Sequence, residues 1–198
     1  MRIWLVPANG PSTAARRAAD VTHQHEPERR RGVSTLLAEV DGRYALPTAG
    51  LPFELRGRAD RIDVTAAGLV ITDYKTGQIP SDSAVRDGYA PQLPLEAAMA
   101  AAGVFPGTAT TTVSGLRYIR ATGAEPPGEQ HIVNLKDESA GAAGAKALTG
   151  LQRLIARFDD PETAYEALRR PRFNYDYDDY AHLARAGEWS VDGGEESG

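Results

Sequence analysis

The chain has 198 residues, a formal net charge of -5 at pH 7, a hydrophobic fraction of 41% and no cysteine. This length fits one domain with tails, and the lack of cysteine excludes disulfides, zinc–thiolate sites and iron–sulfur clusters. The acidic net charge excludes a general basic surface, so any contact with nucleic acid must come from a local patch. No apolar run approaches the length of a membrane span, about 18 residues, and a protein without cysteine fits the cytoplasm.

The predicted elements, in chain order, are a helix, three strands, a helix, a strand and a further helix, as hydrophobic periodicity and turn residues indicate. Their expected ranges are residues 12–38 (helix), 36–46 (a strand that turns at Asp41-Gly42), 53–64 and 68–75 (strands around a turn at Thr65–Gly68), 92–102 (helix), 110–121 (strand) and 136–158 (helix), with another helix after Pro161. A loop rich in Pro, Ser and Asp is expected before the helix that begins at Gln92.

This order of elements predicts an α/β domain with a mixed sheet, because adjacent strands form a hairpin while a helix crosses to the fourth strand. We expect a central sheet of about four strands flanked by helices. The expected domain covers residues 1–190 and is a fragment of a longer chain. The Gly/Glu-rich stretch 191–198 is expected to be a disordered tail.

The hairpin "GRADRIDVTAAGLVITDYKTG", residues 57–77, contains several charged residues in strands, where Asp and Lys are disfavoured. If its loop has an even number of residues between Val64 and Leu69, Asp60 lies opposite Asp73, with Cβ atoms about 4.5–5.5 Å apart. Like charges at such positions destabilise a sheet. A divalent cation between them removes the repulsion and takes oxygen ligands from both.

Strand alternation places Lys75 on the same face as Asp73, where its ammonium group can stabilise a developing oxyanion or position an attacking water. Asp63 falls on the other face and is left out of the metal shell. A one-residue slip of the hairpin would undo this choice. The simpler alternative is a solvated edge hairpin, but a carboxylate, a turn and an apolar run leading into D-x-K is the arrangement that a metal-dependent nuclease needs.

Four segments resemble the C-terminal nuclease domain of the AddB family, in the RecB-like branch of the PD-(D/E)XK superfamily. They are "GRADRID", "VITDYKTG", "PSDSAV" and "PQLPLEAAMAAAG". The ending "RPRFNYDYDDYAHLARAGEWS" and the early pattern of Trp4, Glu39, Val40 and Gly42 also resemble this family. The resemblance implies a restriction-endonuclease-like α/β core.

The resemblance also implies the roles of individual residues. Asp60 matches the metal-binding Asp of the G-x-x-D block, Asp73 the acidic position of (D/E)-x-K, and Lys75 its catalytic lysine. Gln92 matches the first residue of the helical Q-x-x-x-Y motif, which approaches the catalytic site and DNA. Glu39 matches, less closely, an acidic residue that precedes the hairpin.

The implied activity is Mg²⁺-dependent, exonuclease-type hydrolysis of DNA, with Mn²⁺ as a substitute. The implied substrate is single-stranded DNA ends, and the implied partner is the AddA helicase–nuclease subunit, in a complex that resects double-strand breaks before recombination. No iron–sulfur cluster is expected, because its cysteines are absent.

Two departures keep another interpretation open. Glu96 stands where the helical motif has Tyr, and His23 and His25 do not match the context of the metal-ligating His that many RecB-like nucleases have, so both are interpreted as surface residues. The chain is then a domain that keeps the fold and serves mainly in AddA binding or DNA threading. A metal-dependent hydrolase of another substrate is a third hypothesis.

Positive charge is concentrated in the hairpin despite the acidic chain. Arg56, Arg58 and Arg61 are predicted to contact DNA. The first two share strand parity with Asp60, so they can flank the metal and meet phosphates. The alternative for these arginines is an ion pair with a neighbouring acid such as Glu54.

Overall fold

The computed structural model describes residues 30–46, 52–108, 110–121 and 128–163. The chain separates into two compact units, Met1–Asp159 and Asp160–Gly198, and nearly all described residues belong to the first. The start of the helix expected at 12–38, most of the helix expected after Pro161 and the tail at 191–198 lie outside the described residues. The extent of a single domain over residues 1–190 stays a prediction.

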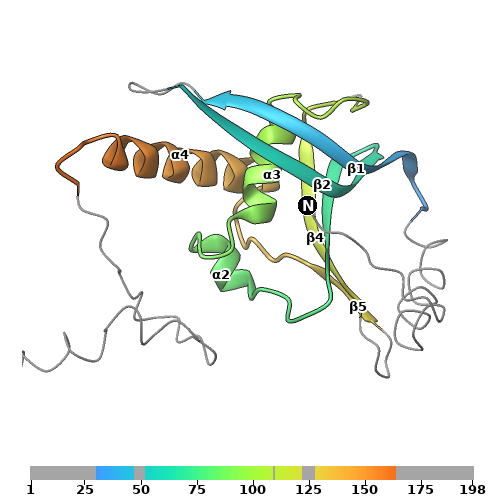
Figure 1. Cartoon of the computed structure of the whole chain (residues 1–198). Helices are drawn as coiled ribbons and strands as arrows, with labels where there is room; N and C mark the ends of the chain where they lie inside the picture. The colour runs from blue at the N-terminus through green and yellow to red at the C-terminus, as the bar shows by residue number, and fades with distance from the viewer. Residues whose placement is uncertain (1–29, 47–51, 109, 122–127, 164–198) are drawn as a thin grey trace, which may run out of the picture. The chain divides into compact units, whose positions relative to one another are not determined.

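The first unit is built on a five-stranded sheet in the order β1-β2-β3-β4-β5 (Figure 1). Neighbouring strands are antiparallel except for β3 and β4, which are parallel. The predicted mixed sheet is therefore confirmed. The strands are β1 (Val33–Leu46), β2 (Phe53–Thr65), β3 (Gly68–Lys75), β4 (Val113–Ala121) and β5 (Gly128–Ile132).

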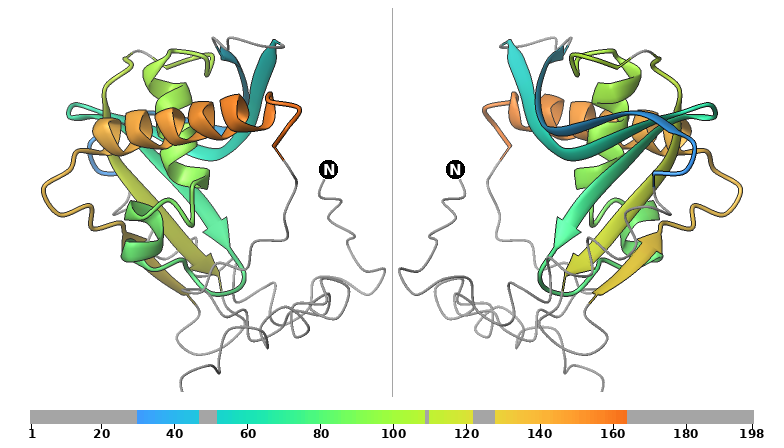
Figure 2. Two further views of the ribbon diagram at one scale, coloured as in Figure 1. Left: turned by 90° about the vertical axis from the view of Figure 1, so that its left-hand side faces the viewer. Right: turned by 90° about the vertical axis from the view of Figure 1, so that its right-hand side faces the viewer.

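Three described helices follow β3 and β5: α2 (Asp82–Arg86), α3 (Gln92–Ala101) and α4 (Ala140–Phe158). The connection through α2 and α3 carries the chain from β3 to β4 and makes these two strands parallel. α3 and α4 pack against each other on one face of the sheet (Figure 2). Among the described residues, no helix is long and apolar enough to cross a membrane.

Strand β1 differs from the prediction in two ways: a helix was expected up to residue 38, and a turn was expected at Asp41-Gly42. It begins at Val33, so residues 33–38 are not helical, and it continues straight through Asp41 and Gly42, which pair with Arg58 and Gly57 of β2. An added Cβ on Gly42 would lie 2.7 Å from the ring of Phe105. Gly42 therefore allows close packing and does not form a turn.

Two elements were not predicted. β5 is a short edge strand without apolar alternation; Glu129 and Gln130 are exposed and Ile132 is 66% exposed. Helix α2 lies in the segment predicted as a loop, where the Ser81 hydroxyl caps its start by accepting a hydrogen bond from Ala84 N. The hairpin and the helix that begins at Gln92 are confirmed. The helix predicted at 136–158 is confirmed at its end, but it begins at Ala140, with Ser139 as its cap.

The core lies between the sheet and helices α3 and α4. Leu69 and Ile71 of β3, Leu116 of β4 and Leu93 of α3 are fully or almost fully buried in it. The helices approach closely because α4 contributes Gly144, where an added Cβ would lie 2.8 Å from the backbone nitrogen of Ala98 in α3.

Candidate active site

The β2–β3 hairpin has the register that the sequence predicts. Val64 pairs with Leu69 and Arg61 with Thr72, and Ala66 and Ala67 form a two-residue loop. The pairing ends at Arg61 and Thr72, so Asp60 of β2 and Asp73 of β3 are the first residues beyond it.

The backbone ladder of the hairpin stops just before Asp60. The first half of β2, from Phe53 up to Asp60, pairs with β1 and not with β3. The carboxylate of Asp60 takes the place of the lost ladder bond, because its Oδ2 accepts a hydrogen bond of 2.9 Å from Tyr74 N. Asp60 is thus fixed at the point where the two strands separate.

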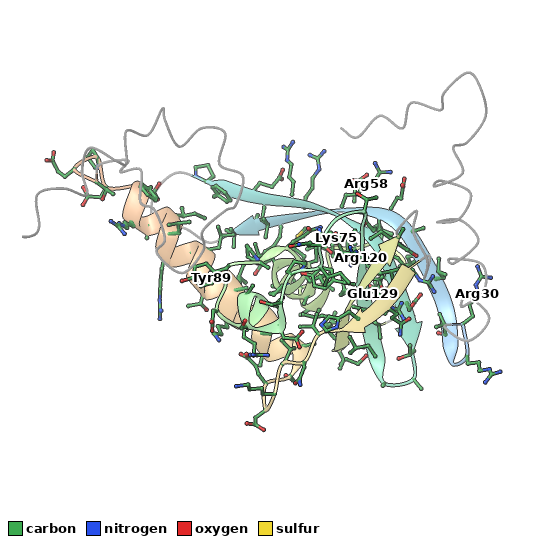
Figure 3. All side chains as sticks on the ribbon, turned by 90° about the horizontal axis from the view of Figure 1, so that it is seen from below. Arg30, Arg58, Lys75, Tyr89, Arg120 and Glu129 are labelled. Atoms are coloured by element: carbon green, nitrogen blue, oxygen red, sulfur yellow. The ribbon has the colours of Figure 1, made fainter. Side chains whose placement is uncertain are left out.

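Asp73, Lys75 and Gln92 form a closed triangle of polar contacts. Lys75 Nζ lies 2.7 Å from Asp73 Oδ2 and donates a hydrogen bond of 2.9 Å to Gln92 Oε1. Gln92 Nε2 in turn donates to Asp73 Oδ1 at 2.6 Å. Asp73 is only 3% exposed, whereas the Lys75 side chain is 28% exposed and can be reached from solvent. Figure 3 labels Lys75 at the end of β3.

The electrostatic environment opposes the charge on Asp73. Burial raises the pKa of this carboxyl above its ordinary value, and the charge of Asp60 raises it further. The hydrogen bonds and positive charge of Lys75, with the Gln92 amide, act in the opposite direction. The pair of carboxylates is therefore held together at an electrostatic cost, which added positive charge would relieve.

Glu96 is a further member of this cluster that the sequence analysis noted only as a departure. It is 5% exposed, and its Oε1 accepts a hydrogen bond of 3.2 Å from Gln92 Nε2. Its Oε2 has no hydrogen-bond partner among the described residues. Burial raises the pKa of Glu96 to about 8, so its carboxyl group is mostly protonated at neutral pH. The four-residue spacing from Gln92 on one helix was the signal that could have predicted it.

Tyr118 of β4 forms the floor beside this cluster. It pairs with Asp73 in the parallel register, is almost fully buried, and its ring centroid lies 5.9 Å from Lys75 Nζ. Burial and the nearby charge of Asp73 raise the pKa of the Tyr118 phenol, which therefore stays protonated. The ring supports the Lys75 ammonium group by a cation–π contact.

The structure places Arg61, which was predicted to contact DNA, inside the protein. The Arg61 side chain is 4% exposed and its Nε donates a hydrogen bond of 2.7 Å to Asp63 Oδ1. Arg117 of β4 pairs with the other oxygen of Asp63 and donates to Thr72 Oγ1 at 2.9 Å. These groups lie on the face opposite Asp73, where Asp63 was expected, and the Asp63 carboxylate pairs with both guanidinium groups inside the protein.

The other predicted charged residues lie at the surface of the β1–β2 arm, the paired segments 39–46 of β1 and 53–60 of β2. Arg56 forms an ion pair with Glu54, as the alternative interpretation expected, and Arg58 forms one with Glu39. Both arginines are exposed. Glu39 has a φ of 53°, a conformation that is uncommon for residues other than glycine. The ion pair with Arg58 turns the Glu39 carboxylate toward solvent, so it does not join the Asp73 cluster.

Asp60 and Asp73 carry the oxygen donors that a hard divalent cation such as Mg²⁺ takes. No three His, Asp or Glu side chains among the described residues are grouped so that they could hold a metal ion. Mg²⁺ commonly binds one or two carboxylates and fills its other positions with water and substrate phosphates. Asp60 and Asp73, close enough for the charge of one to raise the pKa of the other, match that pattern.

Comparison with known proteins also indicates a nuclease family. A family model described as the PD-(D/E)XK nuclease superfamily matches residues 7–173. A protein of Rickettsia bellii described as uncharacterized is 27% identical over 176 residues, which cover 79% of this chain and 20% of the relative. An uncharacterized protein of Rickettsia typhi is 38% identical over 73 residues, or 36% of this chain and 8% of the relative.

This chain therefore spans a small part of the length of these relatives. Among solved structures, the crystal structure of SSO0001 is similar with a TM-score of 0.40 and 14% identity, covering 80% of this chain and 63% of that chain. The family model covers most of this chain and includes the whole β2–β3 hairpin and helix α3. The chain belongs to the PD-(D/E)XK nuclease superfamily.

Proposed function

We propose that this chain is a Mg²⁺-dependent, exonuclease-type domain that hydrolyses phosphodiester bonds of DNA. The observation that carries this proposal is the cluster of Asp60, Asp73, Lys75 and Gln92 where β2 and β3 separate. Its members come from two strands and a helix, so the fold itself brings them together.

The proposed roles follow from the contacts in the cluster. Asp60 and Asp73 would hold Mg²⁺, or Mn²⁺ in its place. The ion would supply charge neutralisation on the phosphodiester and a lower pKa for the attacking water. Lys75 places a positive charge at the solvent-accessible side of Asp73, where it can stabilise the oxyanion of the transition state. Gln92 orients Lys75 and Asp73 through its two amide atoms.

We propose single-stranded DNA ends as the substrate. Arg56 and Arg58 are exposed on the β1–β2 arm that leads to Asp60, and their partners Glu54 and Glu39 are also accessible to solvent. Exposed ion pairs contribute little stability, so DNA phosphates can replace these acids as partners. The contacts would position the strand without reading its sequence.

The finer assignment rests on the resemblance of the hairpin and helix segments to AddB. We propose that the chain is the C-terminal nuclease domain of an AddB-like protein, that its partner is the AddA subunit, and that the complex resects double-strand breaks in the cytoplasm. The match to only 20% of a longer relative supports a domain within a longer protein.

One contact favours a second candidate function. Lys75 Nζ lies 2.7 Å from Asp73 Oδ2, so the lysine engages an oxygen that a metal ion would need. A domain in which this ion pair persists would be inactive and would serve in AddA binding or DNA threading.

A cleavage assay separates these candidates. The chain is incubated with end-labelled single-stranded DNA and Mg²⁺, with EDTA as the blank. Lys75→Ala should lower the rate by about 10²–10³-fold, because it removes a positive charge aimed at the transition state. Lys146→Ala, which removes an exposed lysine on α4, should cleave like the parent. Equal cleavage by parent and Lys75→Ala, or none by the parent with AddA present, would reject the nuclease proposal.

A further inference from the structure

A second positively charged side chain, that of Arg120, lies beside Lys75 and takes part in none of the contacts described above. Arg120 of β4 is the partner of Lys75 in the parallel β3–β4 register. Two like charges at such cross-strand positions destabilise a sheet. In Figure 3 the labelled side chains of Lys75 and Arg120 lie next to each other at the ends of these strands.

Both cations lie on the face of the sheet that carries the proposed active site. Tyr118 is the cross-strand partner of Asp73 and contacts the Lys75 ammonium group with its ring. Arg120 follows Tyr118 by two residues in the same strand, so its side chain leaves the sheet on the same side. The order along this face is therefore Asp73 and Lys75 on one strand and Tyr118 and Arg120 on the next.

Arg120 differs from Lys75 in having no partner within the part of the chain that the structure describes. Lys75 contacts Asp73 and Gln92. Among the described residues, Arg120 has no hydrogen bond or ion pair, and its Nε is both buried and unpartnered. Glu129 of β5 lies opposite Arg120 in register but is exposed and does not form an ion pair with it. A buried, unpaired guanidinium nitrogen is costly unless a ligand satisfies it.

The guanidinium group is planar and always charged, and its fork of donors matches the oxygens of a phosphate. We propose that Arg120 binds a phosphate of the DNA strand next to the one that is cut. This inference rests on the nuclease function proposed above and names a substrate contact of that site. A phosphate there would satisfy Arg120 and remove its repulsion with Lys75. Because the contact forms equally in the bound substrate and in the transition state, its loss should raise KM more than it lowers kcat.

The test is DNA binding without metal, which does not depend on cleavage. Fluorescence anisotropy of a labelled oligo-dT is measured in EDTA at several salt concentrations. Arg120→Gln should weaken binding about 10-fold, the loss of one charge-assisted contact. The slope of log affinity against log salt should fall by about 0.7, the value for one phosphate of a single strand. Arg153→Gln, which removes an exposed arginine of α4, should bind like the parent.

Stability measurements separate a binding role from a structural one. Arg120→Gln removes an unpaired charge, so its thermal midpoint should equal or exceed that of the parent. Arg120→Lys keeps the charge but not the planar fork, and should lose less affinity than Arg120→Gln. If Arg120→Gln does not fold, the affinity of Arg120→Lys for oligo-dT is compared with that of the parent instead.

The inference is overturned if Arg120→Gln binds oligo-dT with the affinity and salt slope of Arg153→Gln, or if the parent does not bind it. Comparison of parent and Lys75→Ala in the cleavage assay decides the nuclease proposal separately. A parent that cleaves, together with an Arg120→Gln variant that binds normally, would reject the Arg120 contact and leave the nuclease function intact.

Discussion

Replacing Asp73 with asparagine is expected to lower the rate of Mg²⁺-dependent DNA cleavage by about 10³-fold. Asparagine keeps the shape of the side chain and an oxygen that can accept from Gln92, but it removes the negative charge proposed to hold the metal ion. Several kcal/mol of transition-state stabilisation are lost with it. The measurement is the initial rate on single-stranded DNA at saturating Mg²⁺, compared with Asp41→Asn, which changes an exposed carboxylate of β1.

The same substitution should not unfold the protein. Burial raises the pKa of the Asp73 carboxyl, so folding disfavours its charged form. A neutral amide at this position is expected to leave the thermal midpoint unchanged or higher in EDTA. A folded Asp73→Asn variant with the cleavage rate of the parent would show that this carboxylate has no part in the chemistry.

Glu96→Gln is expected to stabilise the metal-free protein at alkaline pH by several kcal/mol. The pKa of Glu96 is about 8 in the folded chain, compared with an ordinary value of 4.5. Because the folded value is higher, the unfolded chain releases this proton first, and stability falls as pH rises from about 4.5 to about 8. The full loss is about 5 kcal/mol by linkage. Glutamine mimics the protonated acid and cannot ionise, so this loss should disappear.

Urea unfolding at pH 5 and pH 8.5 measures this effect. The parent should lose more stability than Glu96→Gln between the two pH values, and the variants should be most alike at pH 5. Glu129→Gln, which removes an exposed carboxylate on β5, is the control for the loss of one charge. The same pH dependence in the parent and in Glu96→Gln would show that Glu96 is not held protonated in the folded protein.

The local geometry of the hairpin could be predicted from the sequence because a short turn and strand alternation determine it. The turn at Thr65–Gly68 fixed the register, and this register put Asp63 on the other face. Asp60 and Asp73 lie just beyond its last pair, close enough for the charge of Asp60 to raise the pKa of Asp73. The same alternation places Arg61 with Asp63, two residues away. Arg61 therefore shares a face with Asp63 and not with Asp60, and its assignment to DNA contact overlooked that parity.

Features that depend on distant segments could not be predicted in this way. The start of β1 at Val33 and its passage through Asp41-Gly42 without a turn come from pairing with β2, which the residues of β1 do not indicate. β5 is an exposed edge strand without an apolar pattern. The placement of Arg120 beside Lys75 depends on the parallel register of β3 and β4, which the crossover through α3 determines.

The most direct test of the central claim is the binding of Mn²⁺ to the metal-free chain, measured by isothermal titration calorimetry. Asp60 and Asp73 are proposed to share one cation, so the parent should bind Mn²⁺, and Asp60→Asn and Asp73→Asn should each bind at least about 10-fold more weakly. Asp41→Asn should bind like the parent. Unchanged Mn²⁺ affinity in both Asp60→Asn and Asp73→Asn would contradict the account.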